Sequence, residues 1–571
     1  MRVSSKNASP AGPGSETPLD LPPLSGEEPR EDRGAAWLSA GARVALPEDP
    51  VTGMTDGTTV LAVTARQKSD PPEAGSAPMR ILVEMRPAFD GHAGIPQETR
   101  LLFRGLSQLP GTRVEGLIQS SNRIIAKGLP AGGHAGWKPY QVIDRLSKFV
   151  VSLQPNPNPS RTEHRAYQWQ LKIKPLQMLV GTALGMRTTM TRFDAAPFKD
   201  FVWRSMFQKT LPTADFPLVT SASFRVVRVP WSGLHRIGLA TRILGGPVYP
   251  RFDTTDFDIV VAETPFPGRV SRNTKLVVRY HDAIPLLLPH TIIDRSYHRA
   301  SHFHALKRNL EDGAWFACVS DATRRDLVSI FPEAEARSVT IPNMVSHHYF
   351  AEDSSPARLA EIINTRRNIG AECGGGKPLS QTGRGPLQRV PRFLLMVSTI
   401  EPRKNHLTLL AAWEQLRTTI DRSLQLVFVG SLGWDHGAIV RKIKPWLKRG
   451  GLHLLEDVPA AELRLLYRHA AVTVCPSFAE GFDFAGVEAM RCGGVVASSD
   501  IPVHRDVYGS ASEYFNPYST DDVAHAVGRL LVPSAAGRRA QLVAEGSRVS
   551  ARYLPEVILP RWQEFLRQVK R

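Results

Sequence analysis

The sequence is poor in cysteine, and its cysteines show none of the spacings typical of disulfide frameworks or metal sites. Four cysteines in 571 residues, Cys318, Cys373, Cys475 and Cys492, lie far apart, with no Cys-x-x-Cys and no ligand-like Cys/His spacing. This pattern argues against a disulfide framework and against a zinc site, and it fits a reducing cytoplasm.

Long hydrophobic runs are also missing. The N-terminus lacks the apolar core of a signal peptide, and no uninterrupted apolar run approaches the ~18 residues needed to span a bilayer. We therefore expect a cytoplasmic protein that is soluble or, at most, peripheral on the inner face of the plasma membrane.

Acidic residues are outnumbered by basic ones. Lysine and arginine total 71 against 54 aspartate and glutamate, a formal net charge of +17. This excess favours anionic partners such as nucleic acid, phosphates or an acidic membrane surface, without choosing among them. At roughly 100–200 residues per domain, the length suggests two or three domains.

Two segments look unlike folded domains. Residues 1–78 are rich in Pro, Gly, Ser and Glu and have little apolar periodicity, which predicts a disordered tail; a start codon misassigned upstream would explain them equally well. Residues 352–391, with Gly374-Gly-Gly376 and Pro378, are typical of a linker. We therefore expect an N-terminal domain at 79–351, a C-terminal domain at 392–555, and a final helix at 556–571 that returns to the N-terminal domain.

Between these segments, short apolar runs alternate with helical patterns. Such an alternation predicts parallel sheets, and the linker predicts two of them. Residues 107–255 are hard to read and are expected to be an insertion. Strands are expected at 79–83, 257–261, 275–279, 317–319, 338–341, 393–397, 424–429, 452–455 and 471–475, with helices at 97–106, 301–312, 322–330, 407–416 and 461–469.

A cationic motif follows the expected strand 393–397. In open α/β sheets, ligands bind beyond the carboxyl ends of strands. Arg403 and Lys404, in Glu401-Pro-Arg-Lys-Asn405, stand beside the start of a helix, and two cations plus free helix N–H groups suit a diphosphate. Taken alone, an Arg-Lys pair is more often a surface pair. Gly430 follows the next strand, where a glycine permits close approach of a ligand to backbone, although any tight turn would look the same.

An acidic motif follows the strand that ends at Cys475. Glu480 is expected in a loop, where its carboxylate can accept hydrogen bonds from sugar hydroxyls. Asp483 is expected to cap a helix that begins near Phe484. Glu488 then lies on that helix, where its two oxygens can accept both hydroxyls of a ribose. A single glutamate on a helix is usually only solvated, but the combination with Arg403 and Lys404 favours a nucleotide-sugar site.

These motifs together resemble the retaining family 4 glycosyltransferases, which have the GT-B architecture. The resemblance covers about 79–106 and 256–570, and its hallmark is the Glu-x7-Glu spacing of Glu480 and Glu488. His281-Asp-Ala-Ile-Pro285 and Val319-Ser-Asp-Ala-Thr323 resemble a mannosyltransferase-like subgroup that builds bacterial surface polysaccharides. Further similar segments are Thr399–Asn405, Val474–Ser477, Ala489–Gly493 with Val495–Ala497, and Ile341-Pro-Asn343.

The resemblance implies a fold and a set of roles. The fold would be α/β: two Rossmann-like parallel-sheet domains that face each other across a cleft, preceded by the disordered tail. Arg403 and Lys404 would neutralise the donor diphosphate, Glu488 would hold the ribose, and Glu480 the transferred sugar. His281 would sit in the interdomain cleft beside the reacting sugar as a catalytic residue, although a histidine after a buried strand could instead be a structural cap. The amides around Phe482, Asp483, Phe484 and Ala485 would touch sugar or phosphate. Gly94 would let the diphosphate approach the backbone, and Gly430 would face the base or ribose.

This chain departs from the family pattern in two places. Members often have Glu-Gly-Phe-Gly at the first glutamate, whereas this chain has Asp483. The segment 107–255 is also longer than the plain fold needs.

The reaction implied by the resemblance is transfer of a hexose with retained anomeric configuration, without metal or cofactor. The donor favoured is GDP-mannose, and the acceptor is a glycan or a lipid-linked glycan. No Asp-x-Asp motif stands where a metal would be expected. A nucleotide-sugar epimerase or phosphorylase of the same fold is the alternative enzyme.

The stretch 141–210 combines basic residues with interleaved aromatics. It could stack on nucleic acid, but it lacks any RNP, helix-turn-helix or zinc signature, so a nucleic-acid partner is not favoured. We expect instead a basic amphipathic surface that meets anionic lipid, with an ordinary core helix as the alternative. Its members would be Lys172, Lys174, Arg187, Arg192 and Lys199 around Leu176-Gln-Met-Leu-Val180.

Overall fold

The computed structural model describes residues 77–571, except Ala93, most of 155–183, residues 243–245, and residues 368–391 apart from Leu387. The expected tail up to residue 76 and the expected linker from residue 368 onward lie outside the described residues. So do Cys373 and, within the basic stretch, Lys172, Lys174 and Leu176.

The N-terminal domain is built on an eight-stranded sheet whose order is β3-β4-β2-β1-β5-β6-β7-β8. All neighbouring strands are parallel except β3 and β4. The buried runs β1, β5 and β6 were predicted from their apolar residues. The strands are β1 (Met79–Glu84), β2 (Thr112–Ile118), β3 (Thr191–Phe193), β4 (Ser223–Val226), β5 (Ile259–Ala262), β6 (Lys275–Tyr280), β7 (Trp315–Cys318) and β8 (Ser338–Thr340).

The segment 107–255, which we expected to be an insertion, is built into this sheet. It contributes β2 and β4 to the parallel part and β3 to the edge. Its aromatic side chains Phe193, Trp203 and Phe207 belong to the N-terminal core, together with Phe103 and Phe224. Because these rings are buried, they are not available as stacking platforms for a nucleic acid.

The C-terminal domain is built on a six-stranded, all-parallel sheet of order β11-β10-β9-β12-β13-β14. Chain order reverses between β9 and β12, so these neighbours form the topological switch point of a Rossmann sheet. The prediction of a second parallel sheet is confirmed. Its strands are β9 (Phe393–Val397), β10 (Gln425–Val429), β11 (Leu452–Leu455), β12 (Val472–Cys475), β13 (Val496–Ser499) and β14 (Ser512–Phe515).

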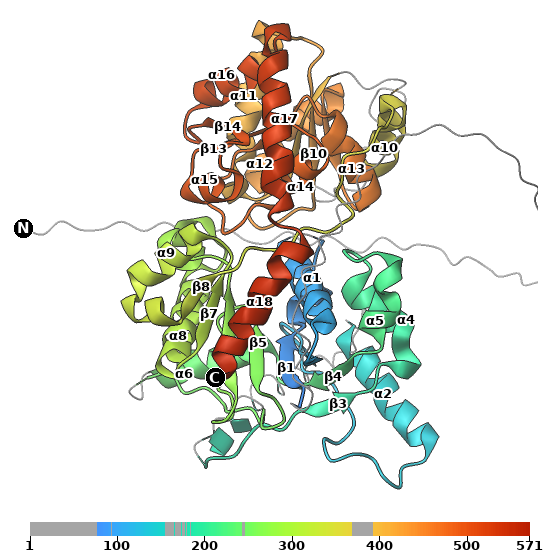
Figure 1. Cartoon of the computed structure of the whole chain (residues 1–571), viewed down its shortest axis with the longest axis vertical. Helices are drawn as coiled ribbons and strands as arrows, with labels where there is room; N and C mark the ends of the chain where they lie inside the picture. The colour runs from blue at the N-terminus through green and yellow to red at the C-terminus, as the bar shows by residue number, and fades with distance from the viewer. Residues whose placement is uncertain are drawn as a thin grey trace, which may run out of the picture. The chain divides into compact units, whose positions relative to one another are not determined.

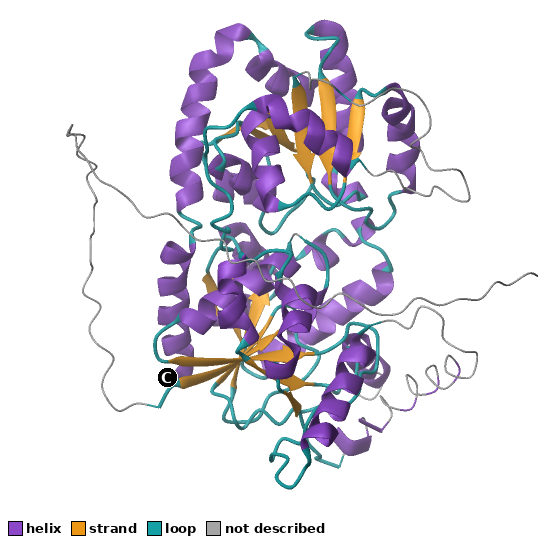
Figure 2. Cartoon of the chain, turned by 90° about the vertical axis from the view of Figure 1, so that its right-hand side faces the viewer, coloured by secondary structure: helices purple, strands orange, loops and turns teal. Residues whose placement is uncertain are grey.

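Helices cover both faces of each sheet (Figure 2). In the N-terminal domain they are α1 (Ile95–Gln108), α2 (Pro139–Leu153), α4 (Lys199–Val202), α5 (Phe216–Thr220), α6 (Trp231–Thr241), α7 (Ile284–Leu287), α8 (Arg295–Glu311) and α9 (Asp321–Ile330). After it come α10 (Leu359–Arg366), α11 (His406–Thr419), α12 (Gly437–Arg449), α13 (Ala460–His469), α14 (Phe484–Arg491), α15 (Pro502–Tyr508), α16 (Thr520–Leu531), α17 (Ala536–Ala551) and α18 (Pro555–Lys570).

The final helix, α18, packs against the N-terminal domain, beside α1 (Figure 1). Ile558, Trp562 and Phe565 are buried in the same core as the strands of the first sheet. The guanidinium of Arg279, on β6, lies 5.3 Å from the ring centre of Trp562. The C-terminal end of the chain therefore completes the N-terminal core.

Replacing Trp562 with alanine should destabilise the N-terminal domain. The indole is fully buried, and truncating a buried tryptophan costs about 3–5 kcal/mol. Val557→Ala on the same helix is the matched control, since Val557 is 46% exposed. Denaturant unfolding should separate the two variants; equal free energies of unfolding would mean that α18 is only loosely attached.

Candidate functional site

The two loops at the switch point of the C-terminal sheet are bound to each other. One runs from β9 to α11 and includes the short 3-10 turn Pro402–Lys404; the other runs from β12 to α14. The Phe478 amide donates to the carbonyl of Arg403 at 3.0 Å, and the Asn405 side chain donates to the carbonyl of Pro476 at 3.0 Å. The cationic and acidic motifs predicted from sequence are therefore brought together.

A compact ion cluster links these loops. One carboxylate oxygen of Glu480 pairs with Arg403 at 2.9 Å, and the other pairs with Lys404 at 2.5 Å. Arg403 also donates to Glu401 at 2.8 Å and to the carbonyl of Ala479 at 2.6 Å. Arg403 is thus divided among three acceptors, whereas the ammonium group of Lys404 pairs with Glu480 alone among the described residues.

The cluster sets the charges of its members. Burial would raise the pKa of Glu480, but Arg403 and Lys404 outweigh it and hold that pKa below its usual value. Burial would likewise lower the pKa of Arg403, yet the charges of Glu480 and Glu401 raise it. Glu480 is therefore ionised and Arg403 is charged.

The predicted helix cap is confirmed at Asp483. Its Oδ1 accepts the backbone N–H of Ala485 at 3.1 Å and begins α14. The rings of Phe482 and Phe484 pack at 5.2 Å from each other in the C-terminal core. The amide of Ala485, which we expected to face the donor, is thus already occupied by the cap.

Glu488 is buried and bound on both oxygens. Gln97 of α1, in the other domain, donates to Oε1 at 2.8 Å, and Tyr467 donates to Oε2 at 3.1 Å. Burial raises the pKa of Glu488 to about 7, although these hydrogen bonds lower it. Its predicted ribose contact stays a prediction.

His281 follows β6 and lies beside a buried glutamate that the sequence did not single out. Its Nε2 is 3.4 Å from Oε2 of Glu263, the residue directly after β5. Burial lowers the pKa of His281 to about 4 and raises that of Glu263 to about 8. At neutral pH both groups are therefore uncharged, and His281 offers hydrogen bonds rather than a positive charge.

The backbone of His281 meets the acidic motif directly. A side-chain carbon added at Gly481 would lie 1.7 Å from the carbonyl oxygen of His281. The hydroxyl of Thr323, on α9, lies 3.3 Å from the Gly481 carbonyl and 3.4 Å from the His281 carbonyl. A glycine after Glu480 is therefore required by the approach of the N-terminal domain's backbone.

The two remaining predicted glycines have different surroundings. Gly94 caps α1 in a left-handed conformation, φ 73°, with open space at the position of a side chain. Arg100 supports its loop by donating to the carbonyls of Asp90 and Gly91 at 2.6 and 2.8 Å. At Gly430, φ is 150° and an added carbon would lie 2.1 Å from the carbonyl of Ser398, so glycine is needed there by the chain's own backbone.

Sequence reasoning missed three polar residues of this region: Gln97, Glu263 and His504. Glu263 stands at the carboxyl end of a buried strand, so the rule that located Glu401 could have found it. Gln97 lies in the first turn of α1, and His504 lies on α15. Their contacts with Glu488 and Asp483 join residues far apart in the chain, and no local pattern signals them.

A family model matches the C-terminal part of the chain. Residues 384–546 match the model of the family described as glycosyl transferases group 1. These residues form a group 1 glycosyltransferase domain. Among the residues that the structure describes, no three His, Cys, Asp or Glu side chains are grouped to hold a metal ion. In that same part of the chain, no helix is both long and apolar enough to cross a membrane.

Curated relatives are similar over part of their length. The chain is 27% identical over 220 residues to O-antigen chain mannosyltransferase B of Escherichia coli, covering 38% of this chain and 52% of that protein. It is 24% identical over 280 residues to serotype-specific mannosyltransferase WbdA of Escherichia coli, covering 48% of this chain and 32% of that protein. The chain thus spans about half or less of the relatives that it matches.

A solved structure has the same fold. Sucrose-phosphate synthase from Thermosynechococcus elongatus superimposes with a TM-score of 0.50 at 15% identity, covering 86% of this chain and 99% of that one. At this identity the likeness concerns the fold alone. It confirms the expected GT-B fold of two Rossmann-like domains.

Gly481→Ala should disturb the contact with His281, because backbone atoms of both segments would have to move apart. We expect a loss of about 1–3 kcal/mol of stability, as for other overpacked sites. Hydrogen exchange should also become faster around residues 281–283 and 480–483. Gly537→Ala is the control, since nothing lies within 4 Å of the added carbon; matching behaviour of the two variants would contradict the contact.

Proposed function

We propose that this protein is a retaining glycosyltransferase that transfers mannose from GDP-mannose to a glycan or a lipid-linked glycan in surface polysaccharide biosynthesis. The observation that carries the proposal is the ion cluster of Arg403, Lys404 and Glu480 at the switch point. The residue after Glu480, Gly481, lies against the backbone of His281. The group 1 domain supports the transferase activity. The names of the mannosyltransferase relatives support the choice of sugar and pathway.

The chemistry of the cluster suits departure of a nucleoside diphosphate. Negative charge gathers on the diphosphate as the glycosidic bond breaks, and a fixed cation beside it lowers the barrier. Lys404 is the cation that can turn toward that charge. Glu480, released from Lys404, would accept hydrogen bonds from hydroxyls of the sugar. The acceptor hydroxyl would pass its proton to the departing phosphate oxygen on the same face of the sugar.

The N-terminal domain would contribute neutral hydrogen-bonding groups. Because His281 and Glu263 are both uncharged at neutral pH, they can orient sugar hydroxyls without attracting a second phosphate. Gly94 would let the diphosphate approach the backbone of the loop before α1. The donor would thus be held by charge on one side and by neutral groups on the other.

Glu480→Gln and Lys404→Ala should each lower kcat roughly 100-fold or more, as removal of a single charge-stabilising group does in other enzymes. Both variants should keep the fold but melt at a lower temperature, because each leaves a buried partner unpaired. Glu361→Gln and Lys442→Ala, at exposed positions, are the matched controls. Activity would be measured with GDP-mannose after a thermal-shift screen of wild type against a panel of nucleotide sugars.

The screen and the kinetics answer separate questions. We expect GDP-mannose to raise the melting temperature of the wild type, and UDP-glucose or a dTDP-deoxysugar not to raise it. If another nucleotide sugar raised the melting temperature instead, the proposed donor would be wrong but the transferase activity would still stand. Full activity of Glu480→Gln or Lys404→Ala would overturn the site.

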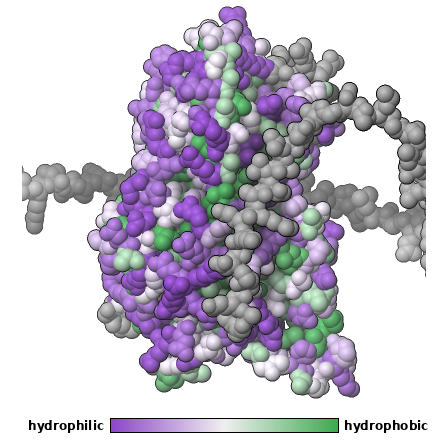
Figure 3. Space-filling view, viewed as in Figure 1, coloured by the Kyte–Doolittle hydropathy of each residue, from purple (hydrophilic) through white to green (hydrophobic). Residues whose placement is uncertain are grey.

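We further propose that the surface around α2 meets anionic lipid, which would bring the enzyme to a lipid-linked acceptor. Tyr140, Ile143 and Val151 of α2 are 66%, 42% and 71% exposed. Lys148 of α2 and Lys138, which directly precedes the helix, are exposed too. Figure 3 shows hydrophobic surface at this end of the N-terminal domain. Apolar side chains flanked by lysines are typical of helices that bind at a membrane interface.

Co-sedimentation with liposomes tests this surface. The full chain should bind vesicles that contain anionic phosphatidylglycerol and should not bind vesicles of phosphatidylcholine alone. The double variant Ile143→Asp/Val151→Asp should no longer bind the anionic vesicles. The control Val557→Asp, at an exposed position of α18, should still bind them. Absence of binding to either vesicle would remove the proposal.

A further inference from the structure

A tryptophan of the C-terminal domain is bonded to the N-terminal domain. Trp434 lies in the loop between β10 and α12, and its indole N–H donates to the carbonyl oxygen of Thr291 at 3.1 Å. Thr291 ends the 3-10 turn Pro289–Thr291, which follows α7. The bond therefore joins two loops that are far apart in the chain and belong to different domains.

On the C-terminal side, the loop of Trp434 is attached to the cationic loop, which runs from β9 to α11. The Ile400 amide donates to the carbonyl of Ser431 at 2.9 Å, and the Gly433 amide donates to the carbonyl of Ile400 at 3.0 Å. A side-chain carbon added at Gly433 would lie 2.6 Å from Cγ2 of Thr399. The two loops are in close contact and should move together.

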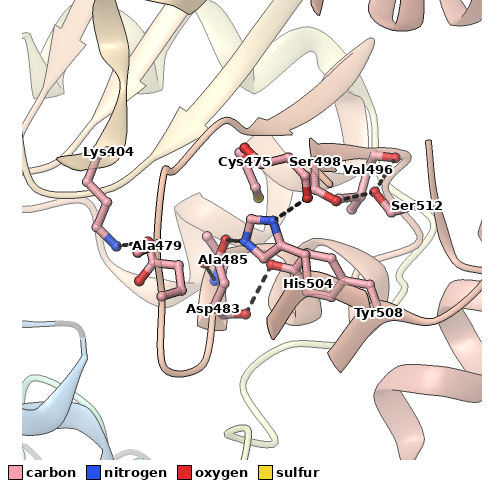
Figure 4. A network of polar contacts seen from close by, with 12 residues as sticks. Lys404, Cys475, Ala479, Asp483, Ala485, Val496, Ser498, His504, Tyr508 and Ser512 are labelled. Atoms are coloured by element: carbon pink, nitrogen blue, oxygen red, sulfur yellow. Dashed lines mark hydrogen bonds and ion pairs between the residues drawn. The ribbon is translucent and has the colours of Figure 1, made fainter. Parts of the chain in front are cut away.

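The cationic loop is in turn bound to the acidic motif. Lys404 pairs with Glu480, and Figure 4 shows the side chain of Lys404 turned toward the loop that contains Ala479. Trp434 is therefore connected, through contacts between neighbouring loops, to the groups proposed to act on the donor.

On the N-terminal side, the carbonyl that accepts the indole N–H is connected to His281. Oδ1 of Asp282 accepts the amide of Ile284 at 2.9 Å, where α7 begins. The Leu288 amide donates to the carbonyl of Ile284 at 2.9 Å. Thr291 donates to the carbonyl of Leu288 through its amide at 3.0 Å and its hydroxyl at 2.8 Å. A series of local hydrogen bonds thus runs from the residue after His281 to Thr291.

The backbone is strained on both sides of the bond. Among the described residues, four that are not glycine have a left-handed backbone conformation: Asp294, Asn405, Asp435 and Asp457. Asp435 directly follows Trp434, and Asp294 comes shortly after Thr291. Asn405 lies in the cationic loop, and Asp457 pairs with His92 of the N-terminal domain at 3.2 Å. Aspartate and asparagine adopt this conformation more readily than most residues, but it persists where surrounding contacts hold it, commonly at clamps and switch regions.

We propose that Trp434 is a positioning residue, whose bond to Thr291 holds the cationic loop of one domain at a fixed distance from His281 of the other while the donor reacts. The inference rests on the proposed function, because it assumes that the donor diphosphate binds at the cationic loop and the sugar beside His281. A donor whose diphosphate and sugar are held by different domains reacts only when both domains are in place. The bond joins two neutral groups, so it can break to admit the donor and form again around it.

Trp434→Phe tests the bond, since phenylalanine keeps an aromatic ring but has no N–H donor. Trp446→Phe is the matched control, because Trp446 of α12 donates its indole N–H to Glu414 of α11 within the C-terminal domain. In the full chain, Trp434→Phe should make hydrogen exchange faster around residues 284–292 as well as around residues 431–436. Trp446→Phe should leave exchange around residues 284–292 unchanged.

GDP and UDP extend this measurement. In wild type, the nucleotide that binds should slow exchange around residues 284–292, because the bound state favours the closed arrangement of the two loops. In Trp434→Phe this protection should be roughly three- to ten-fold smaller, which is the effect of one neutral hydrogen bond. A role confined to the C-terminal domain would change exchange only around residues 431–436.

Turnover supplies a second measurement, with the nucleotide sugar that the thermal-shift screen selects and with water as the acceptor. Water adds its oxygen to the anomeric carbon and its proton to the departing diphosphate, so the products are the free sugar and the nucleoside diphosphate. Trp434→Phe should lower kcat for this release more than it raises KM, because the bond is needed chiefly in the transition state. Trp446→Phe should change neither.

The two proposals fail in different ways. If wild type bound neither GDP nor UDP, the proposed function would fail, and this inference with it. If wild type bound a nucleotide and Trp434→Phe matched wild type in exchange around residues 284–292, the function would stand and the role of Trp434 would be wrong. If the protein released no nucleotide with water as the acceptor, the exchange measurement alone would decide.

Discussion

The buried ion cluster around Glu480 is the interaction on which the rest of the site depends. One carboxylate holds Arg403 and Lys404, and Arg403 in turn holds Glu401 and the carbonyl of Ala479. Charges taken out of water are stable only when each has its partner, so removing one member exposes the others to the full cost of burial. The cluster therefore fixes the two switch-point loops together.

Much of this architecture could be predicted from the sequence, because its strands are short apolar runs that are buried on both faces. The run 393–397 is β9 as expected, and Asp483 caps its helix as expected. The spacing of Glu480 and Glu488 located the acidic motif. Each of these features involves residues close together in the sequence, so a local sequence pattern is enough to predict it.

The rest depends on contacts between distant residues. Strand β2 was not recognised because Glu115 interrupts its apolar pattern, and Arg225 interrupts β4; the two side chains pair at 2.7 Å, both buried. Gln97 with Glu488, and His504 with Asp483, are likewise pairs of polar residues that are distant in the chain and meet in the folded protein. From the sequence alone, each of these polar residues would be assigned to the solvent-exposed surface. The partner that allows its burial is distant in the chain, so no local sequence pattern reveals it.

The position of α18 has a consequence for how the protein is made. The side chains of Ile558, Trp562 and Phe565 fill part of the N-terminal core, yet the ribosome adds them after the whole of the C-terminal domain. The N-terminal domain is synthesised first, but its apolar groove for α18 stays open to solvent while the C-terminal domain is synthesised and folds. The C-terminal domain is therefore complete before the N-terminal domain, whose core is closed only when α18 packs into it.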